Sequence, residues 1–303
     1  MPAPRHLHGG AFLIVAACAH ADLANAPVRL LSPTGVRLER VPCSSGSELA
    51  APVSVNGTVG WFILDSGTFA HAVYGAFAKR AGLAVGPATE TIGGGAGIAV
   101  HTLADPTFEV LGVGRFTTRE VLVIDEATTP LARDTCGVAG VIAPSFLATE
   151  DRAVVIDFRA RTLDRIPIAE IDRTLDAVHG ARFDVAAGAG YGFTADATID
   201  HVATRLLVDT GACCTWVMAG GEVSRALAPR SKSGGKLGTL DGMRAYRGAT
   251  AALAFGAVTR TLEVHVVDAG PGDSVDDGGI GSEALAGCVL VFTPHDLHGA
   301  CGR

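Results

Sequence analysis

Short apolar or alternating segments, separated by turn residues, fill most of the chain beyond residue 36. Segments of this kind, bounded by Gly, Pro, Asn and Asp, are typical of β-strands rather than of helices. In the first half they lie at residues 52–55, 60–64, 107–110, 115–124, 137–147 and 153–158. Asn56-Gly57, between the first two segments, predicts a two-residue hairpin turn. One short helix is expected at residues 75–82, where Gly82 supplies the stop signal.

One strand-and-turn motif occurs twice. The apolar run 59–64 leads directly into Asp65-Ser66-Gly67-Thr68, and the run 203–208 leads into Asp209-Thr210-Gly211-Ala212. In each copy an apolar strand therefore ends in a carboxylate, a small hydroxyl residue and a glycine. The similarity extends upstream in the same register, because residues 53–56 lie opposite residues 197–200.

The rest of each half repeats one order of features: a glycine-rich hairpin, an apolar-Gly turn, a short helix and a closing strand. The paired segments are 91–100 with 231–238, 140–147 with 278–285, and 153–158 with 288–292; further strands are expected at 249–255 and 260–267. Self-similarity over roughly 100 residues is a strong signal of an internal repeat. The sequence therefore predicts an all-β protein whose two halves bring two Asp side chains together.

Composition indicates a folded chain with one large or two medium domains. Of the 303 residues, 48% are hydrophobic and 18% are charged, which is ample for a core and excludes a disordered or nucleic-acid-binding polymer. The 39 glycines suit tight turns, and the net charge of −7 argues against a polyanionic partner. The polar run 169–180 is the best connector between domains at 27–178 and 179–303.

Residues 1–26 have the pattern of a secretory signal peptide. A basic head with Arg5 precedes the apolar run 11–17, and Ala19-His20-Ala21 or Ala24-Asn25-Ala26 supplies a cleavage site. This pattern predicts an exported protein, periplasmic or secreted; a frayed tail is the alternative without a targeting role. Val15-Ala16-Ala17-Cys18 also matches a bacterial lipobox, so a lipid on Cys18 stays open as the link to a membrane. Elsewhere no apolar run approaches the roughly 20 residues that a membrane helix needs.

Six cysteines remain once Cys18 is set aside. An even number in an exported chain predicts disulfide bonds, and the sequence leaves their connectivity open. The adjacent Cys213 and Cys214 have no His placed convincingly beside them, which favours a buried structural role over nucleophilic chemistry. The six are Cys43, Cys136, Cys213, Cys214, Cys288 and Cys301.

The two Asp-hydroxyl-Gly loops have a chemical interpretation as a pair. Two carboxylates about 3 Å apart cannot both ionise, so Asp65 and Asp209 would share one proton. The ionised member can activate a water molecule as a general base, while the protonated member polarises a peptide carbonyl. Gly67 and Gly211 would allow the two backbones to approach each other closely. A lone Asp-Ser-Gly is more often an Asx turn, but two matched copies favour the dyad.

Other polar residues near these motifs have simpler explanations. His71, directly after the first loop, is expected as a core or surface residue rather than a catalytic one. Asp273, Asp276 and Asp277 form an acidic, glycine-rich turn without the spacing of an EF-hand calcium loop. The glycines at 93–97 lack the spacing and the following helix of a phosphate-binding loop, so a hairpin is expected there.

The two Asp loops, each followed by an apolar-Gly segment at 140–142 or 278–280, resemble the aspartic protease superfamily, specifically the bacterial two-lobed, retropepsin-like aspartyl proteases. The resemblance covers residues 36–297. It implies a bilobal pepsin/retropepsin-like fold, with two pseudo-twofold-related β-barrel-like lobes and a central cleft. It also implies that Asp65 and Asp209 are the catalytic residues, acting through a water molecule without a metal or other cofactor.

The resemblance assigns supporting roles to the residues around the dyad. Ser66 and Thr210 would bind across the lobe interface and, with Gly67, Thr68 and Gly211, fix the geometry of the carboxyls. The hairpin residues that would form a flap over the substrate are Ile92, Gly93, Gly94, Gly95 and Gly97.

The two halves also differ at several positions. Thr68, the fourth residue of the first loop, corresponds to Ala212 in the second. Only Asp65 therefore has a neighbouring hydroxyl, which is expected to donate to its outer oxygen. Such a donor favours the charged form of Asp65 and would leave the shared proton mainly on Asp209. Ala143 stands where the second half has Gly281, and the first hairpin lacks a Tyr. The second hairpin contains Lys232 and Lys236 and is either a loop or a second flap.

The predicted function is an aspartic endopeptidase, a monomer that cleaves peptide or protein substrates with an intramolecular pair of aspartates; no nucleic-acid partner is expected. One alternative is a catalytically silent, exported peptide-binding protein with the same cleft. The other is a structural exported β-protein whose Asp turns are incidental. Close approach of the two carboxyls would argue against the structural alternative, and only turnover separates the enzyme from the binder.

Overall fold

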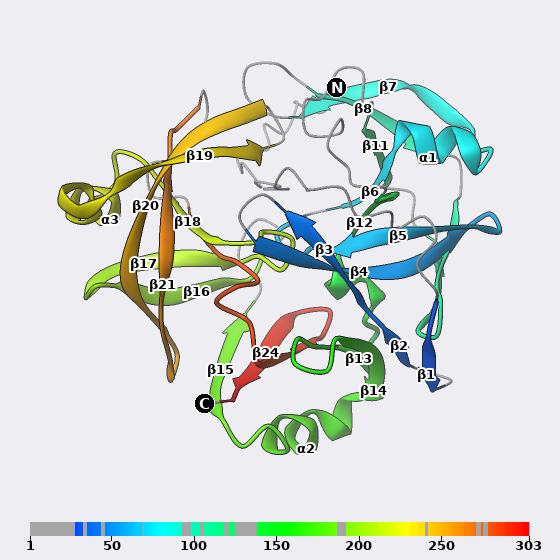
Figure 1. Cartoon of the computed structure of the whole chain (residues 1–303). Helices are drawn as coiled ribbons and strands as arrows, with labels where there is room; N and C mark the ends of the chain where they lie inside the picture. The colour runs from blue at the N-terminus through cyan, green and yellow to red at the C-terminus, as the bar shows by residue number, and fades with distance from the viewer. Residues whose placement is uncertain are drawn as a thin grey trace, which may run out of the picture.

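The computed structural model shows an all-β chain (Figure 1). It describes residues 28–32, 35–43, 46–68, 70–92, 98–103, 106–117, 121–124, 138–186, 192–239, 242–270, 274 and 278–302. The expected signal segment, Cys136, the flap glycines at 93–97, and Asp273, Asp276 and Asp277 lie outside these residues. The described strands form three sheets, which we name the first, second and shared sheets.

The first sheet contains the first Asp loop, and a tight hairpin precedes that loop. Asn56 and Gly57 both have positive φ, 49° and 82°, and join two strands whose ends pair in register, as the sequence predicts. Helix α1 (Gly75–Arg80) follows, and Gly82 with φ 63° lies just beyond it. Across the sheet the strands are β10 (Gly114–Thr117), β9 (Thr107–Val110), β4 (Gly46–Val55), β5 (Thr58–Leu64), β12 (Gly140–Ile142), β6 (His71–Tyr74), β11 (Val121–Ile124), β8 (Ile98–Leu103) and β7 (Val85–Ile92); β3 (Glu39–Cys43) pairs with β4, and η3 (Pro144–Leu147) follows β12.

The second sheet has the same strand order as the main part of the first. Its strands are β16 (Thr194–Ile199), β17 (Val202–Val208), β22 (Gly278–Ile280), β18 (Thr215–Met218), β21 (Val258–Val267), β20 (Gly242–Phe255) and β19 (Lys232–Thr239). They correspond one for one to β4, β5, β12, β6, β11, β8 and β7, and the parallel pairs β5–β12 and β6–β11 have counterparts in β17–β22 and β18–β21. Helix α3 (Glu222–Leu227) and η5 (Ala228–Arg230) lie between β18 and β19.

The shared sheet joins strands from the start, the middle and the end of the described chain. Its order is β1 (Leu30–Ser32), β2 (Gly35–Arg37), β14 (Thr162–Pro167), β13 (Arg152–Asp157), β23 (Cys288–Phe292), β24 (Asp296–Cys301) and β15 (Ala181–Ala186). The central pair is antiparallel, with Val155 opposite Val291. In Figure 1 this sheet lies below the other two, with the first sheet on the right and the second on the left. The polar connector at 169–180 contains η4 (Ile168–Glu170) and α2 (Ile171–Asp176).

Strand β5 explains how the core reaches the Asp loops. Phe62 and Leu64 point into one cluster of buried side chains, and Phe62 packs edge-on against Phe77 of α1 with ring centroids 5.4 Å apart. Trp61 and Ile63 point into another cluster, which also contains Trp216 and Met218 of β18. Residues 60–64 of β5 are buried on both faces, which agrees with their uninterrupted apolar sequence. Core side chains from both sheets therefore pack together beside the loops.

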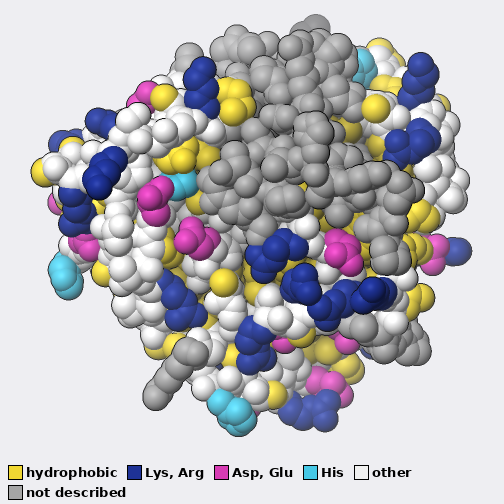
Figure 2. All heavy atoms as spheres, viewed as in Figure 1, with side chains coloured by type: hydrophobic (Ala, Val, Ile, Leu, Met, Phe, Trp, Pro, Cys, Tyr) yellow, Lys and Arg dark blue, Asp and Glu magenta, His cyan; other side chains and the backbone are white. Residues whose placement is uncertain are grey.

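The surface carries charges of both signs, as the face in Figure 2 shows. Arg182, for example, lies 3.0 Å from Asp172 and 2.6 Å from Asp176, and all three side chains are exposed. Such surface pairs contribute only about 0–1 kcal/mol each, so the buried clusters carry most of the stability. Among the described residues, every helix is too short or too polar to cross a bilayer.

The structure describes the side chains of four cysteines, which form two groups; the side chain of Cys43 lies outside its description. Cys288 of β23 and Cys301 of β24 are directly opposite each other and form a disulfide within the second half of the chain. Cys213 and Cys214 are buried and reduced, with their sulfur atoms 3.7 Å apart. The vicinal pair is thus part of the core, whereas the disulfide closes the hairpin at one side of the shared sheet.

Replacing Cys288 and Cys301 together with Ala should lower the free energy of unfolding by about 2–3 kcal/mol, because the disulfide restricts the unfolded chain across a separation of 13 residues. Urea denaturation under oxidising conditions measures the difference. A reductant should destabilise the wild type by a similar amount and leave the double variant unchanged. Equal stability of the two proteins under oxidising conditions would contradict the prediction.

Candidate active site

Both Asp loops begin in the same way. Asp65 follows β5, and its N–H donates to the carbonyl of Ile142 in β12 at 2.9 Å. Asp209 follows β17, and its N–H donates to the carbonyl of Ile280 in β22 at 3.0 Å. Because β12 and β22 run parallel to the strands that lead into the loops, each loop leaves its sheet at an equivalent point.

Ser66 and Thr210 tie the two loops to each other. The Ser66 hydroxyl donates to the carbonyl of Val208 at 2.6 Å, and the Thr210 hydroxyl donates to the carbonyl of Leu64 at 2.7 Å. The Thr210 hydroxyl oxygen also accepts the backbone N–H of Ser66 at 3.0 Å, and the Ser66 hydroxyl oxygen accepts the backbone N–H of Thr210 at 3.1 Å. All four bonds are buried and link residues from opposite halves of the chain.

Glycine is required on both sides of the pair because the loops are so close. A Cβ on Gly67 would lie 2.8 Å from Cγ of Asp209, and a Cβ on Gly211 would lie 2.3 Å from Cγ of Asp65. These separations are shorter than carbon–carbon contact, so any side chain would push the opposite carboxyl away. The carboxyl of each Asp thus occupies the space that a side chain would need at the glycine of the other loop.

Backbone amides bind one oxygen of each carboxyl. Oδ1 of Asp65 accepts the N–H of Gly67 at 2.7 Å, and Asp65 also receives the backbone N–H of Thr68. Oδ1 of Asp209 accepts the N–H groups of Gly211 and Ala212, both at 3.0 Å. The two Oδ2 atoms are buried, and no backbone N–H or hydroxyl group in the described part of the chain donates to them. The remaining acceptor capacity of the pair is therefore at Oδ2.

The two carboxyls are fully buried and lie close enough for each to affect the pKa of the other. Because two carboxylates are both acceptors, they form a hydrogen bond with each other only when one of them carries a proton. Burial raises the pKa of Asp65 to about 6, against the lowering effect of the Gly67 amide and of Asp209 as a donor. Burial, then the charge of Asp65, raises the pKa of Asp209 well above its usual range. The two carboxyls therefore titrate as a pair that retains one shared proton above the pH at which an isolated Asp ionises.

The expected role of the Thr68 hydroxyl is wrong. That hydroxyl donates to the carbonyl of Ala70 at 2.9 Å rather than to Asp65. Thr68 supports Asp65 through its backbone N–H alone. Ala212 provides the same backbone bond to Asp209, so the hydroxyl at position 68 does not distinguish the two carboxyls.

Each of the two sheets that carry an Asp loop has a hairpin at its edge, β7–β8 in the first and β19–β20 in the second. Ile92 ends β7 and pairs with Ile98 at the start of β8, while the flap glycines between them lie outside the described residues. At the corresponding place in the second sheet, β19 and β20 form a hairpin that pairs Thr239 with Gly242. The Lys-containing stretch is therefore a strand, which its Gly-rich sequence does not reveal.

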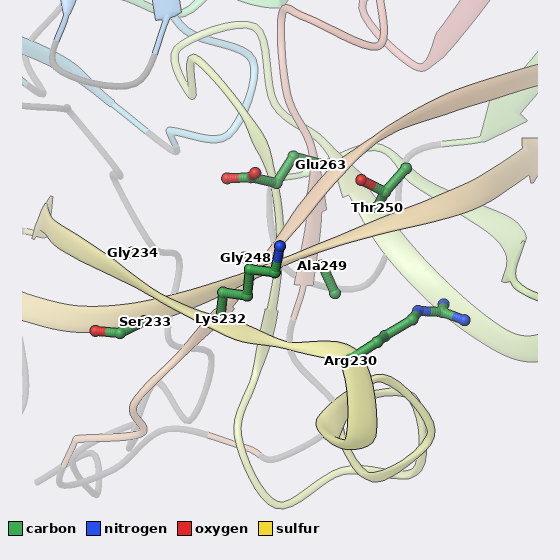
Figure 3. A pocket seen from close by; sticks show the side chains of 8 residues that line it. All are labelled: Arg230, Lys232, Ser233, Gly234, Gly248, Ala249, Thr250 and Glu263. Carbon is green, nitrogen blue, oxygen red and sulfur yellow. The ribbon is translucent and has the colours of Figure 1, made fainter.

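A polar depression of about 540 Å³ lies on this second hairpin. In Figure 3 Lys232 of β19 extends toward Glu263 of β21, and Arg230 points away from both. Arg230 forms an ion pair with Asp200, and Glu263 contacts Nε2 of His265 at 3.0 Å. The depression is lined by neither Asp65 nor Asp209, so it is separate from the carboxyl pair.

No protein-family model and no curated protein matches the chain. Among the residues that the structure describes, no three His, Cys, Asp or Glu side chains are grouped so as to hold a metal ion. The functional interpretation therefore depends on the geometry of the carboxyl pair itself.

Asp209→Asn should be more stable than the wild type at pH 7 by about 1–3 kcal/mol, because Asn keeps an acceptor for the two amides and needs no bound proton. The folded wild type holds its carboxyl protons more tightly than the unfolded chain does, whose Asp residues titrate near 3.8. Its stability is thus greatest below that pH and falls as the pH rises through about 6. The advantage of the variant should shrink toward pH 4 in urea unfolding experiments.

The matched control is Asp196→Asn, whose side chain is 87% exposed in the wild type. This change should alter the free energy of unfolding by no more than about 1 kcal/mol, because it removes only an exposed ion pair with Arg205. An Asp209→Asn protein that is less stable than the wild type at every pH would contradict the assignment of a strained, proton-sharing pair.

Proposed function

We propose that this protein is an aspartic endopeptidase of the retropepsin-like kind, with Asp65 and Asp209 as its catalytic dyad. The observation that carries the proposal is the contact between two fully buried carboxyls, one from each copy of a repeated loop. Two unrelated Asx turns would not be expected to form the reciprocal hydrogen bonds that Ser66 and Thr210 make between the loops. The contact therefore argues against a purely structural role.

The two carboxyls divide the chemistry between them. In the proposed mechanism Asp65 is the base: it accepts a proton from a water molecule, whose oxygen then attacks the carbonyl carbon of a peptide bond. Asp209, the member that holds the proton, donates a hydrogen bond to the carbonyl oxygen as negative charge develops there. Both steps would take place at the Oδ2 atoms, which accept no hydrogen bond from the described N–H and hydroxyl groups. This chemistry needs a water molecule and no metal or other cofactor.

The fold that we propose is bilobal and pepsin/retropepsin-like, with the first and second sheets as the bases of the two lobes. Support comes from the matching strand order and from the shared sheet, which pairs β13 of one half with β23 of the other. In this arrangement the substrate is a peptide or protein bound between the lobes, under the hairpin of β7 and β8. One chain supplies both aspartates, so a monomer is sufficient.

Turnover tests the proposal and separates it from a silent peptide-binding protein. The wild type, incubated with a proteome-derived peptide library and followed by mass spectrometry, should cleave peptides at internal bonds. Asp65→Asn and Asp209→Asn should each lower kcat by about 10²–10⁴-fold or more, because either change removes the one-charge, one-proton pair. Activity should rise as the pH increases through about 6, where Asp65 ionises, and fall again when Asp209 loses its proton.

Asp196→Asn is the control and should retain full activity, because the Asp196 side chain of β16 is exposed. Full peptidase activity in either dyad variant would refute the catalytic assignment. Peptide binding by a wild type that shows no cleavage at any pH would favour the silent binder.

We also propose that the chain is exported, to the periplasm or the medium. Expression of the full chain in a bacterium should yield a protein that has lost residues up to a site near Ala21 or Ala26 and that carries the Cys288–Cys301 disulfide. Mass spectrometry of the mature N-terminus measures this. Processing that is blocked by globomycin and by Cys18→Ser would indicate a lipid anchor, whereas a cytosolic protein with Met1 intact and reduced thiols would contradict export.

A further inference from the structure

His71 is a buried residue immediately after the first Asp loop, at the start of β6. Its side chain is surrounded by phenyl rings from three other elements. The ring centroids of Phe116, Phe146 and Phe108 lie 4.7, 5.4 and 6.1 Å from that of the imidazole. The ring is 1% exposed, so its position is fixed by packing.

One peptide group connects His71 to Asp65. Nδ1 of His71 accepts the backbone N–H of Ala143 at 3.2 Å. The carbonyl of that same peptide group belongs to Ile142 and accepts the backbone N–H of Asp65 at 2.9 Å. A hydrogen bond at one end of a peptide group polarises it and strengthens the bond at the other end. The imidazole therefore holds the group on which the Asp65 backbone is anchored.

The hydrogen bond requires a neutral imidazole with its proton on Nε2. Nε2 is buried, and no partner in the described part of the chain reaches it. Burial lowers the pKa of His71 to about 3. The ring thus remains an acceptor for Ala143 over the pH range in which Asp65 and Asp209 share one proton.

The second Asp loop lacks this support. Asp209 is anchored on the carbonyl of Ile280 in the same way, but Thr215 occupies the first position of β18, where β6 has His71. Oγ1 of Thr215 is buried without a partner among the described residues. The turn is instead packed directly on the neighbouring backbone, because a Cβ on Gly281 would lie 2.2 Å from the carbonyl oxygen of Cys214. The two loops are therefore held by different means.

We propose that His71 is a positioning residue for Asp65: its Nδ1 fixes the Ile142–Ala143 peptide and thereby the angle at which the Asp65 carboxyl faces Asp209. The role rests on the proposed function, since it concerns the base of the dyad. Displacement of a reacting group by about 1 Å can cost roughly 100-fold in rate. Loss of the acceptor at position 71 should consequently affect kcat rather than KM.

The decisive comparison is between His71→Phe and His71→Asn. Phe preserves the aromatic packing but has no acceptor for the Ala143 N–H. The side-chain oxygen of Asn can take the position of Nδ1 in His71 and accept that N–H. We expect His71→Phe to lower kcat about 10–100-fold with KM unchanged, and His71→Asn to recover most of that loss. Hydrogen exchange at the Ala143 amide should be fast in His71→Phe and slow in His71→Asn. Thr215→Val, at the matched position of the second half, should change neither quantity.

A second readout keeps this test separate from that of the proposed function. The titration of the Asp65 carboxyl, followed by carbon NMR in the full chain, should shift in His71→Phe and return in His71→Asn, whether or not any peptide is cleaved. If His71→Phe does not fold, His71→Gln replaces it, because the longer side chain places its amide near Nε2 rather than Nδ1. Unchanged Asp65 titration and unchanged Ala143 exchange in the acceptor-free variant would overturn the proposal.

Discussion

The reciprocal hydrogen bonds of Ser66 and Thr210 are the constraint on which the site depends. Two carboxyls that are buried side by side are unfavourable by several kcal/mol unless they are paired and hydrogen-bonded. Four buried cross-loop bonds, each worth about 1 kcal/mol net, oppose the separation of the loops. The absence of a Cβ at Gly67 and Gly211 lets the loops come close enough for these bonds to form. Removal of one hydroxyl would therefore leave an unpaired carbonyl and loosen both carboxyls together.

This local constraint needs a frame that places two separate sheets in register. Each loop is anchored on the strand behind it, β12 or β22, so its position follows from its own sheet. The antiparallel pair of β13 and β23 then joins the two halves in the shared sheet. Trp61 of the first sheet and Trp216 of the second belong to one buried cluster beside the loops. The geometry of the carboxyl pair is thus a property of the whole chain and not of either half alone.

Turns and loop motifs that depend on neighbouring residues could be predicted from the sequence. Contacts between residues far apart in the sequence could not. Asn56-Gly57 predicts its turn because both residues tolerate positive φ, whereas the matching turn at Asp200-His201, with φ of 46° and 70°, has no glycine to reveal it. The repeat of the Asp loops predicts which carboxyls meet. The sequence does not reveal the true partner of the Thr68 hydroxyl, because the nearby carbonyl of Ala70 competes with Asp65 for it. The place of His71 depends on phenyl rings that lie far away in the sequence.

In a repeated structure the differences between the copies decide how the chemistry is divided. Asp65 and Asp209 receive the same kind of support from their own loops, two backbone amides each, so these donors do not separate a base from an acid. The clear difference lies behind the loops, where an imidazole holds the peptide under Asp65 and close backbone packing holds the one under Asp209. Because the two carboxyls compete for one proton, a difference of about 1.4 kcal/mol shifts its distribution tenfold. A residue that touches neither carboxyl can therefore set which of them is the base.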